Sequence, residues 1–295
     1  VGGVGVDVIA GSFGTPAYVF DENDLRSRAR DFKVAFDKAF ATFGTGAETF
    51  YAGKAFMNLA IARWIADEGL SLDVCTGGEL AVALRAGFPP DRIGMHGNNK
   101  SETELARALA AGVGRIVVDS AVEIDRLSRL ARDLGTPAKV MVRITVGVEA
   151  HTHEYIATAH EDQKFGFSLA GGSAAAAVSA VLAEPALELL GLHSHIGSQI
   201  FDTAAFEVAA RRTLGLHAQI RDEHGVELPE LGLGGGFGMA YTTQDDPQPP
   251  DELAAEMAAI VGTDCQTLGV SVPRVSVEPG RAIAGPSTLT LYEIG

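Results

Sequence analysis

The sequence predicts an α/β protein, and within that class a (β/α)8 barrel. Eight short apolar or β-branched segments alternate with longer amphipathic, Ala-rich segments, which is the pattern of parallel strands separated by helices. A chain of 295 residues suffices for one barrel of this kind. Reactive side chains follow most of the predicted strands, at the end where barrel enzymes build their active sites.

The predicted strands, in chain order, are residues 49–53, 70–74, 92–96, 115–119, 139–144, 188–195, 230–235 and 274–279. The clearest helical segments between them are residues 58–69, 78–87, 101–112, 121–135 and 203–225. Several end in Gly after a charged last turn, and Ser101 and Glu104 have the spacing of a capping box. A doubly wound open sheet fits this alternation almost as well as a barrel.

Charge and composition exclude several classes of partner. The 23 Lys and Arg against 38 Asp and Glu give a net charge of −15, which opposes contact with nucleic acid or an anionic membrane surface. No apolar run is long enough to span a bilayer, and no signal peptide is evident, so we expect a cytoplasmic protein. With only Cys75 and Cys265, no disulfide framework is indicated, and we expect Cys75 to be a small buried residue.

Residues 145–168 form a polar insertion after the fifth predicted strand, which is too long for a plain connection. It contains three histidines and two nearby glutamates that could be read as metal ligands: His151, His153, Glu154, His160 and Glu161. Their spacing does not follow H-E-x-x-H, and no cysteine cluster accompanies them. We therefore predict no metal site.

Strand ends carry most of the candidate chemistry. Lys54 follows the first strand, and a desolvated lysine amine loses its proton more readily and can attack a carbonyl; a surface lysine is the alternative. Residues 232–238, "GLGGGFG", could let backbone amides approach a phosphate, although the spacing is not that of a dinucleotide-binding loop. Glu278 and Arg281 in "EPGR" could hold a protonated ring nitrogen and an anion, or simply form an ion pair. Together, these features indicate pyridoxal 5′-phosphate.

The motifs also resemble, in order and spacing, those of diaminopimelate decarboxylases, which belong to the alanine-racemase-like class of pyridoxal-phosphate barrels. The resemblance covers residues 12–295, is closest in style to actinobacterial members, and rests on "FYAGKAF", "LDVCTGGEL", "HGNNKS", "VGVEAHTHE", "HEDQKFGFS", "GLHSHIGSQIF", "LGGGFGMAY" and "VEPGRAIAGP". It implies decarboxylation of meso-2,6-diaminopimelate to L-lysine and CO2, the last step of lysine biosynthesis.

The resemblance assigns the ring of the cofactor to five residues. Lys54 would bind the cofactor covalently, and His195 would stack on its ring, which makes these two the expected catalytic residues. Glu278 would pair with the ring nitrogen. Asp73 and Arg143 would support the ring and its hydroxyl side by hydrogen bonds.

The phosphate is assigned to a second group of residues. Ser198, Gly235, Gly236, Gly280 and Arg281 would hold it, and Arg281 would also lie near the substrate carboxylate. The family shares its sites across a homodimer, so we expect a homodimer of the full-length protein.

The resemblance also predicts the domain organisation. Residues 1–20 would be the N-terminal strand segment of a second, β domain, residues 21–288 the barrel, and residues 289–295 the start of the C-terminal β domain. The rest of that domain is expected to be missing, because the family continues beyond this point and the sequence begins with Val. A non-catalytic cofactor-binding fragment, an ornithine or arginine decarboxylase, and a cofactor-free lysine aldolase remain as alternatives.

Overall fold

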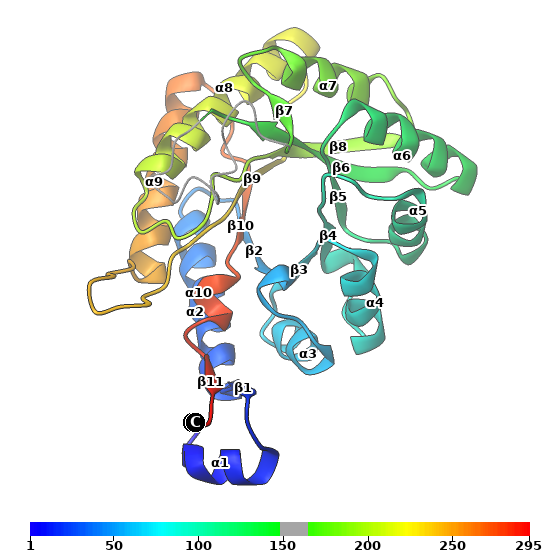
Figure 1. Cartoon of the computed structure of the whole chain (residues 1–295). Coiled ribbons are helices and arrows are strands. Elements are labelled where there is room, and N and C mark those ends of the chain that lie inside the picture. The colour runs from blue at the N-terminus through cyan, green and yellow to red at the C-terminus, as the bar shows by residue number, and fades with distance from the viewer. Residues whose placement is uncertain (148–164) are drawn as a thin grey trace.

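A computed structural model describes residues 1–147 and 165–295, and its central feature is a closed barrel of eight parallel strands (Figure 1). The strands are β2 (Ala47–Ala52), β3 (Ser71–Val74), β4 (Ile93–Met95), β5 (Arg115–Val118), β6 (Ala138–Thr145), β8 (Leu187–His193), β9 (Glu230–Gly235) and β10 (Arg274–Glu278). β10 pairs with β2, and β5 pairs with β6, so no edge is left open. The predicted barrel is confirmed, and the open-sheet alternative is wrong.

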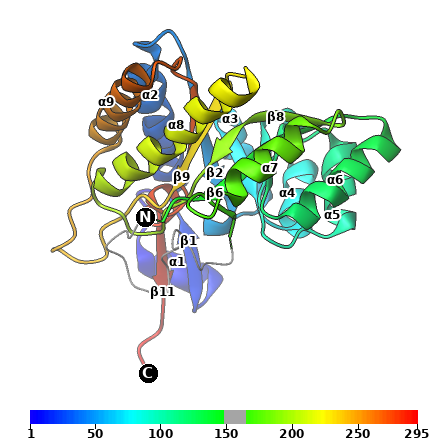
Figure 2. The same cartoon turned by 90° about the horizontal axis from the view of Figure 1, so that it is seen from above.

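The helices lie outside the strands (Figures 1 and 2). They are α2 (Glu22–Ala41), α3 (Leu59–Asp67), α4 (Gly77–Ala86), α5 (Glu102–Ala111), α6 (Ala121–Leu134), α7 (Ser173–Leu182), α8 (Ala204–His224) and α9 (Pro250–Leu268). Short polar side chains begin many of them: Thr76 accepts a hydrogen bond from the N–H of Glu79, and Ser101 and Glu104 form the predicted capping box. Each helix buries one apolar face against the strands, as Phe36 and Phe40 do from α2.

The amino ends of the strands are closed by a network of charged side chains. Arg115, the first residue of β5, lies 3.0 Å from Glu230 Oε2, bonds to Glu48, and stacks its guanidinium 4.5 Å from the ring centre of Phe50. These contacts fill the bottom of the barrel with side chains. The cavities that contain the candidate site lie at the carboxyl ends instead.

A short two-stranded sheet lies apart from the barrel, at the lower end of the molecule in Figure 1. β1 (Ala17–Phe20) pairs antiparallel with β11 (Thr288–Leu291). Residues 1–20, which were predicted to contribute only a strand, also contain the helix α1 (Val6–Phe13). The chain passes from the barrel to β11 through α10 (Arg281–Ala284). Elsewhere, the two-residue strand β7 (Phe167–Ser168) pairs with the end of β6.

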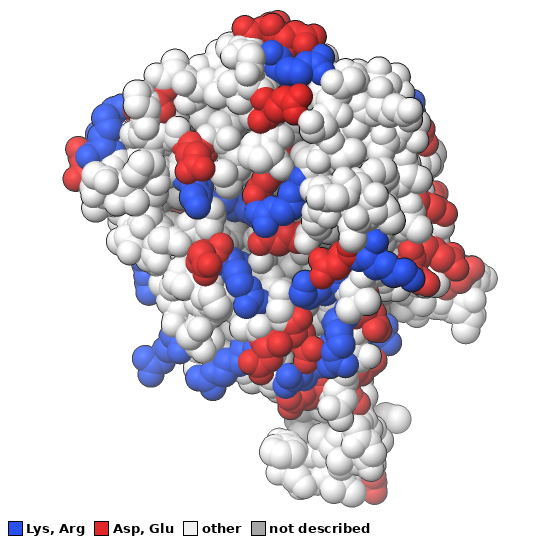
Figure 3. All heavy atoms as spheres, turned by 180° about the vertical axis from the view of Figure 1, so that it is seen from behind, with Lys and Arg blue, Asp and Glu red and all other residues white. Residues whose placement is uncertain are grey.

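Acidic and basic side chains alternate over the face shown in Figure 3, so this face carries no extended basic patch. Ion pairs also join residues far apart in the chain, such as Arg132 with Glu184 and Arg26 with Glu68. Within residues 1–147 and 165–295, no helix combines the length and apolar character needed to cross a bilayer.

Candidate active site

Two adjoining cavities of about 640 and 270 Å³ lie at the carboxyl ends of the strands. Lys54, His195 and Glu278 border both of them. The larger cavity is also lined by Ser198, Gly236, Tyr241, Gly280 and Arg281, and the smaller one by Asp73, Cys75, His96, Arg143 and His193. The predicted site residues are thus brought together, except that Gly235 lines neither cavity.

Lys54 is exposed, which corrects the expectation of a partly desolvated amine. It follows β2 but lies in the short 3-10 turn η1 (Gly53–Ala55), and this turn carries its side chain out of the strand. Gly53 is buried and packs against the backbone of Asp73. The amine therefore lies at the boundary between the two cavities instead of within the core.

His195 is held against β9 by a hydrogen bond from the backbone. The N–H of Gly235 donates to His195 Nδ1 over 3.2 Å, so Nδ1 carries no proton. Burial, together with the nearby cations Lys54 and Arg143, holds the pKa of His195 well below its usual range. The ring is consequently a neutral imidazole with its proton on Nε2, suited to stacking.

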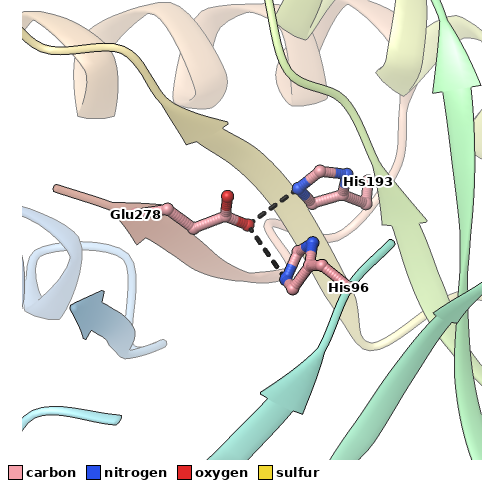
Figure 4. Close-up of side chains that lie close together, drawn as sticks. All are labelled: His96, His193 and Glu278. Carbon is pink, nitrogen blue, oxygen red and sulfur yellow. Dashed lines mark hydrogen bonds and ion pairs between the residues drawn. The ribbon is translucent and has the colours of Figure 1, made fainter. Parts of the chain in front are cut away.

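Glu278 lies in a buried polar cluster with His96 and His193 (Figure 4), and Asp73 at the end of β3 adjoins it. His193 Nε2 is 2.7 Å from Glu278 Oε1, and His96 Nε2 is 3.7 Å from the same oxygen. His96 Nε2 also lies 3.1 Å from Asp73 Oδ1. The two imidazole rings meet edge to face, with their centres 5.1 Å apart.

The charge of this cluster is concentrated on Glu278. Burial lowers the pKa of His193 and lowers that of His96 to about 4, so both rings are neutral at neutral pH. Burial, followed by the Glu278 carboxylate, raises the pKa of Asp73 well above its usual range. Burial alone would also raise the pKa of Glu278, but the positive charge that His193 and His96 gain in acid, together with the hydrogen bond from His193, favours the carboxylate and holds that pKa well below the usual range. At neutral pH, where both rings are uncharged, the hydrogen bond from His193 remains.

His96, His193 and Glu278 also offer three ligand atoms within 4.8 Å of one another. Such a group could hold a metal ion, but Arg143 acts on both imidazoles and Lys54 acts on that of His96, and these cations oppose a further positive charge. A protonated ring nitrogen, which spreads one charge and donates a hydrogen bond, suits the carboxylate better. The five residues weighed as metal ligands in the polar insertion lie outside the described residues.

The far end of the larger cavity is suited to an anion. Arg281 Nη2 donates to Ser198 Oγ over 3.2 Å, and Nη1 bonds to the hydroxyl of Tyr241. Gly236 has φ +99°, and a Cβ there would collide with the carbonyl of Gly197. Glycine thus lets two backbone segments pack together beside an exposed guanidinium, which is the donor set that a phosphate requires.

Arg143 occupies the opposite wall, in the smaller cavity. Its guanidinium lies 3.8 Å from Asp119 Oδ2 and 4.5 Å from the ring centre of Phe165. Cys75 is half-buried and also lines this cavity, rather than being the small core residue expected; burial raises the pKa of its thiol to about 12.

The sequence alone indicates no role for His96, His193 or Tyr241. The spacing of His193 and His195 was a usable signal, because residues two apart in an extended chain face the same side. Tyr241 follows the glycine-rich segment and gave no comparable signal.

Comparisons with known proteins agree with this geometry. Residues 23–285 match the family described as "Pyridoxal-dependent decarboxylase, pyridoxal binding domain". The chain is 54% identical to diaminopimelate decarboxylase of Mycobacterium tuberculosis over 299 residues, covering all of this chain and 65% of that protein. It is 57% identical to the enzyme of Mycobacterium leprae, covering 97% of this chain and 60% of the relative. The chain therefore spans less than two thirds of the length of these relatives.

Solved structures show the same fold. Diaminopimelate decarboxylase from M. jannaschii, crystallised with L-lysine, superposes with a TM-score of 0.90 at 30% identity, covering 98% of this chain and 66% of that one. The enzyme from Helicobacter pylori, also with L-lysine, gives a TM-score of 0.84 at 28% identity, covering 99% of this chain and 71% of that one.

Proposed function

The chain belongs to the pyridoxal-dependent decarboxylases, and we propose that it is the cofactor-binding barrel of a diaminopimelate decarboxylase. The whole protein would convert meso-2,6-diaminopimelate to L-lysine and CO2. The observation that carries the proposal is the joint cavity, with Lys54 at its middle, Glu278 on one wall and Arg281 at the anion end. The names of the relatives at 54–57% identity favour this substrate over ornithine or arginine.

The residues present fit pyridoxal 5′-phosphate. We assign the phosphate to Ser198, Gly236, Gly280 and Arg281, which line the anion end. Gly235 acts indirectly, because its N–H donates the hydrogen bond that holds His195. When bound, the cofactor supplies an electron sink for the pair released as CO2 leaves.

The side chains around the ring have separate tasks. Glu278, kept ionised in a buried position, would pair with a positively charged ring nitrogen of the cofactor and so favour its protonated form. The neutral ring of His195 would cover one face of the cofactor ring and exclude water from it. Lys54 borders both cavities, where its Nζ would hold the cofactor and could exchange a proton with the substrate amino group.

Asp73 and Arg143 support the same end of the site. Asp73 contacts His96 beside Glu278, and Arg143 provides a buried cation beyond the two imidazoles. We propose further that the whole protein acts in the cytoplasm as a homodimer, as the sequence resemblance implies. The domain boundaries predicted at residues 20 and 288 fall where β1 ends and β11 begins, which supports that division.

The test is cofactor binding and turnover by the purified chain and two variants. Pyridoxal phosphate should give a visible absorbance band near about 420 nm, and borohydride reduction followed by mass spectrometry should locate the cofactor on Lys54. Lys54→Ala should lose both signals, while Lys38→Ala, at an exposed position on α2, should keep them.

Release of CO2 is then measured with meso-diaminopimelate, ornithine and arginine in turn. Turnover of meso-diaminopimelate alone would support the substrate proposed. A lysine-bound cofactor without CO2 from any of the three would refute catalysis by this chain and leave the alternative of a cofactor-binding fragment. Absence of cofactor binding would refute the proposal as a whole.

A further inference from the structure

Both imidazoles of the buried cluster reach the same oxygen of Glu278. His193 Nε2 and His96 Nε2 lie 2.7 and 3.7 Å from Oε1, and the second carboxylate oxygen points away from them (Figure 4). Because Oε1 belongs to an ionised carboxylate that accepts over 2.7 Å, the proton of His193 is on Nε2. One oxygen is therefore fixed by the protein while the other is left for a ligand.

The contact between His193 and Glu278 crosses an intervening strand. His193 ends β8 and Glu278 ends β10, while β9 lies between them in the barrel. Gly232 of β9 makes the crossing possible, because a Cβ at this position would lie 2.8 Å from His193 Cδ2. Any larger residue would have to move the imidazole away from the carboxylate.

Among the described residues, the ring of His193 has no hydrogen-bond partner other than Glu278. His193 Nδ1 is buried without a hydrogen-bond partner among these residues, as is Asp73 Oδ2. Burying an unpaired polar atom costs free energy, so the hydrogen bond to Glu278 is the interaction that orients this ring. His96, held by Asp73 Oδ1, closes the other side.

We propose that His193, assisted by His96, is a positioning residue that fixes the rotamer and the charge of Glu278, so that its free oxygen keeps the ring nitrogen of the bound cofactor protonated. This inference rests on the proposed function, because it requires the cofactor ring to meet Glu278. In this role His193 acts through Glu278 and does not need to touch the cofactor or the substrate.

The consequence of removing His193 follows from the burial of Glu278. Without its hydrogen bond, a buried carboxylate binds a proton more readily or rotates toward another donor. Either change weakens its hold on a ring proton. We expect the ring nitrogen to release its proton at least ~10-fold more readily, the effect of losing one hydrogen bond to a charged group.

The experiment uses 4-deoxypyridoxine 5′-phosphate labelled with ¹⁵N in the ring, which binds without forming a bond to Lys54. The ¹⁵N chemical shift reports ring protonation directly. In the unchanged protein the nitrogen should stay protonated between about pH 6 and about pH 9. In His193→Ala it should titrate within that window, and His193→Gln, whose amide can donate to Oε1, should restore part of the protection. His217→Ala, a buried histidine outside the cavities, is the matched control and should behave like the unchanged protein.

A nitrogen that stays protonated in His193→Ala as in the unchanged protein would overturn the positioning role while leaving the proposed function intact. Failure of the probe to bind the unchanged protein would overturn both. Should His193→Ala not fold, ¹⁵N NMR of the histidines in the unchanged protein still decides the matter: a proton on Nδ1 of His193 would contradict the inference, and a proton on Nε2 supports it.

Discussion

Replacing His217 by leucine should make the protein less sensitive to acid. His217 is buried in α8, and its Nε2 has no hydrogen-bond partner among the described residues. Burial lowers the pKa of this imidazole to about 4, whereas the same side chain in an unfolded chain titrates near about 6.5. The folded state therefore keeps a neutral ring over a range in which the unfolded state binds a proton.

The sign and size of the effect follow from this difference. As the pH falls below about 6.5, protonation favours the unfolded chain, and the loss continues until the folded state itself binds the proton near pH 4. Between about pH 7 and about pH 5, a single group with these two pKa values lowers the free energy of unfolding by about 2 kcal/mol. His217→Leu removes this contribution, because leucine fills a buried position without a group that titrates.

The assay is urea unfolding at both pH values for the unchanged protein, His217→Leu and His224→Leu. His96 and the other buried histidines are common to all three proteins, so their titration cancels in the comparison. His224 is exposed at the end of the same helix and serves as the control for replacing a histidine at the surface. The reasoning would be refuted if the free energy of unfolding fell equally between the two pH values in His217→Leu and in the unchanged protein.

Two further predictions concern the phosphate end of the cavity, and one concerns a buried ion pair. Gly236→Ala, at φ +99°, should weaken pyridoxal-phosphate binding measured by absorbance titration. The control is Gly225→Ala, at φ +68° with open space around it. It should add similar backbone strain, of about 1–3 kcal/mol, and leave cofactor binding unchanged. The buried Lys100 Nζ lies 2.7 Å from Glu123 Oε1. Lys100→Met should lower the free energy of unfolding by about 3–5 kcal/mol, because it leaves the buried Glu123 carboxylate without this partner. Adding Glu123→Gln should recover part of the loss in the same urea assay. Arg281→Ala should weaken binding of pyridoxal phosphate by at least ~10-fold while changing that of pyridoxal little, and an equal loss for both ligands would contradict the phosphate assignment.

The fold was largely predictable because its elements are local. Each barrel strand carries a short run of buried residues, and each predicted strand lies within a few residues of an observed one, as 188–195 does for β8 (Leu187–His193). Closure was not predictable in the same way. It depends on pairings such as Val275 with Ala47, far apart in the chain, and a burial pattern shows that a strand is covered without showing which strand lies beside it. β1 and β11 are short and half-exposed, so they produce no clear pattern at all.

The site was predictable in position but not in its detailed chemistry. Parallel strands bring their carboxyl ends together, so residues that follow them were expected to meet. The exposure of Lys54 depends on a single 3-10 turn after β2, which the apolar sequence before it does not signal. The role of His193 depends on a contact across β9 with Glu278, and no local pattern encodes such a contact.

The glycine-rich segment after position 231 shows why sequence motifs and contacts must be considered together. Its glycine content predicts a phosphate-binding loop, but of its glycines only Gly236 lines the larger cavity. Gly232 leaves room for His193 to reach Glu278, and a Cβ at Gly234 would lie 2.9 Å from His195 Nδ1. The segment therefore serves the ring end of the site as well as the phosphate end. A substitution at Gly232 should accordingly resemble loss of His193 in its effect on ring protonation, rather than loss of phosphate affinity, and the ¹⁵N-labelled probe would distinguish the two results.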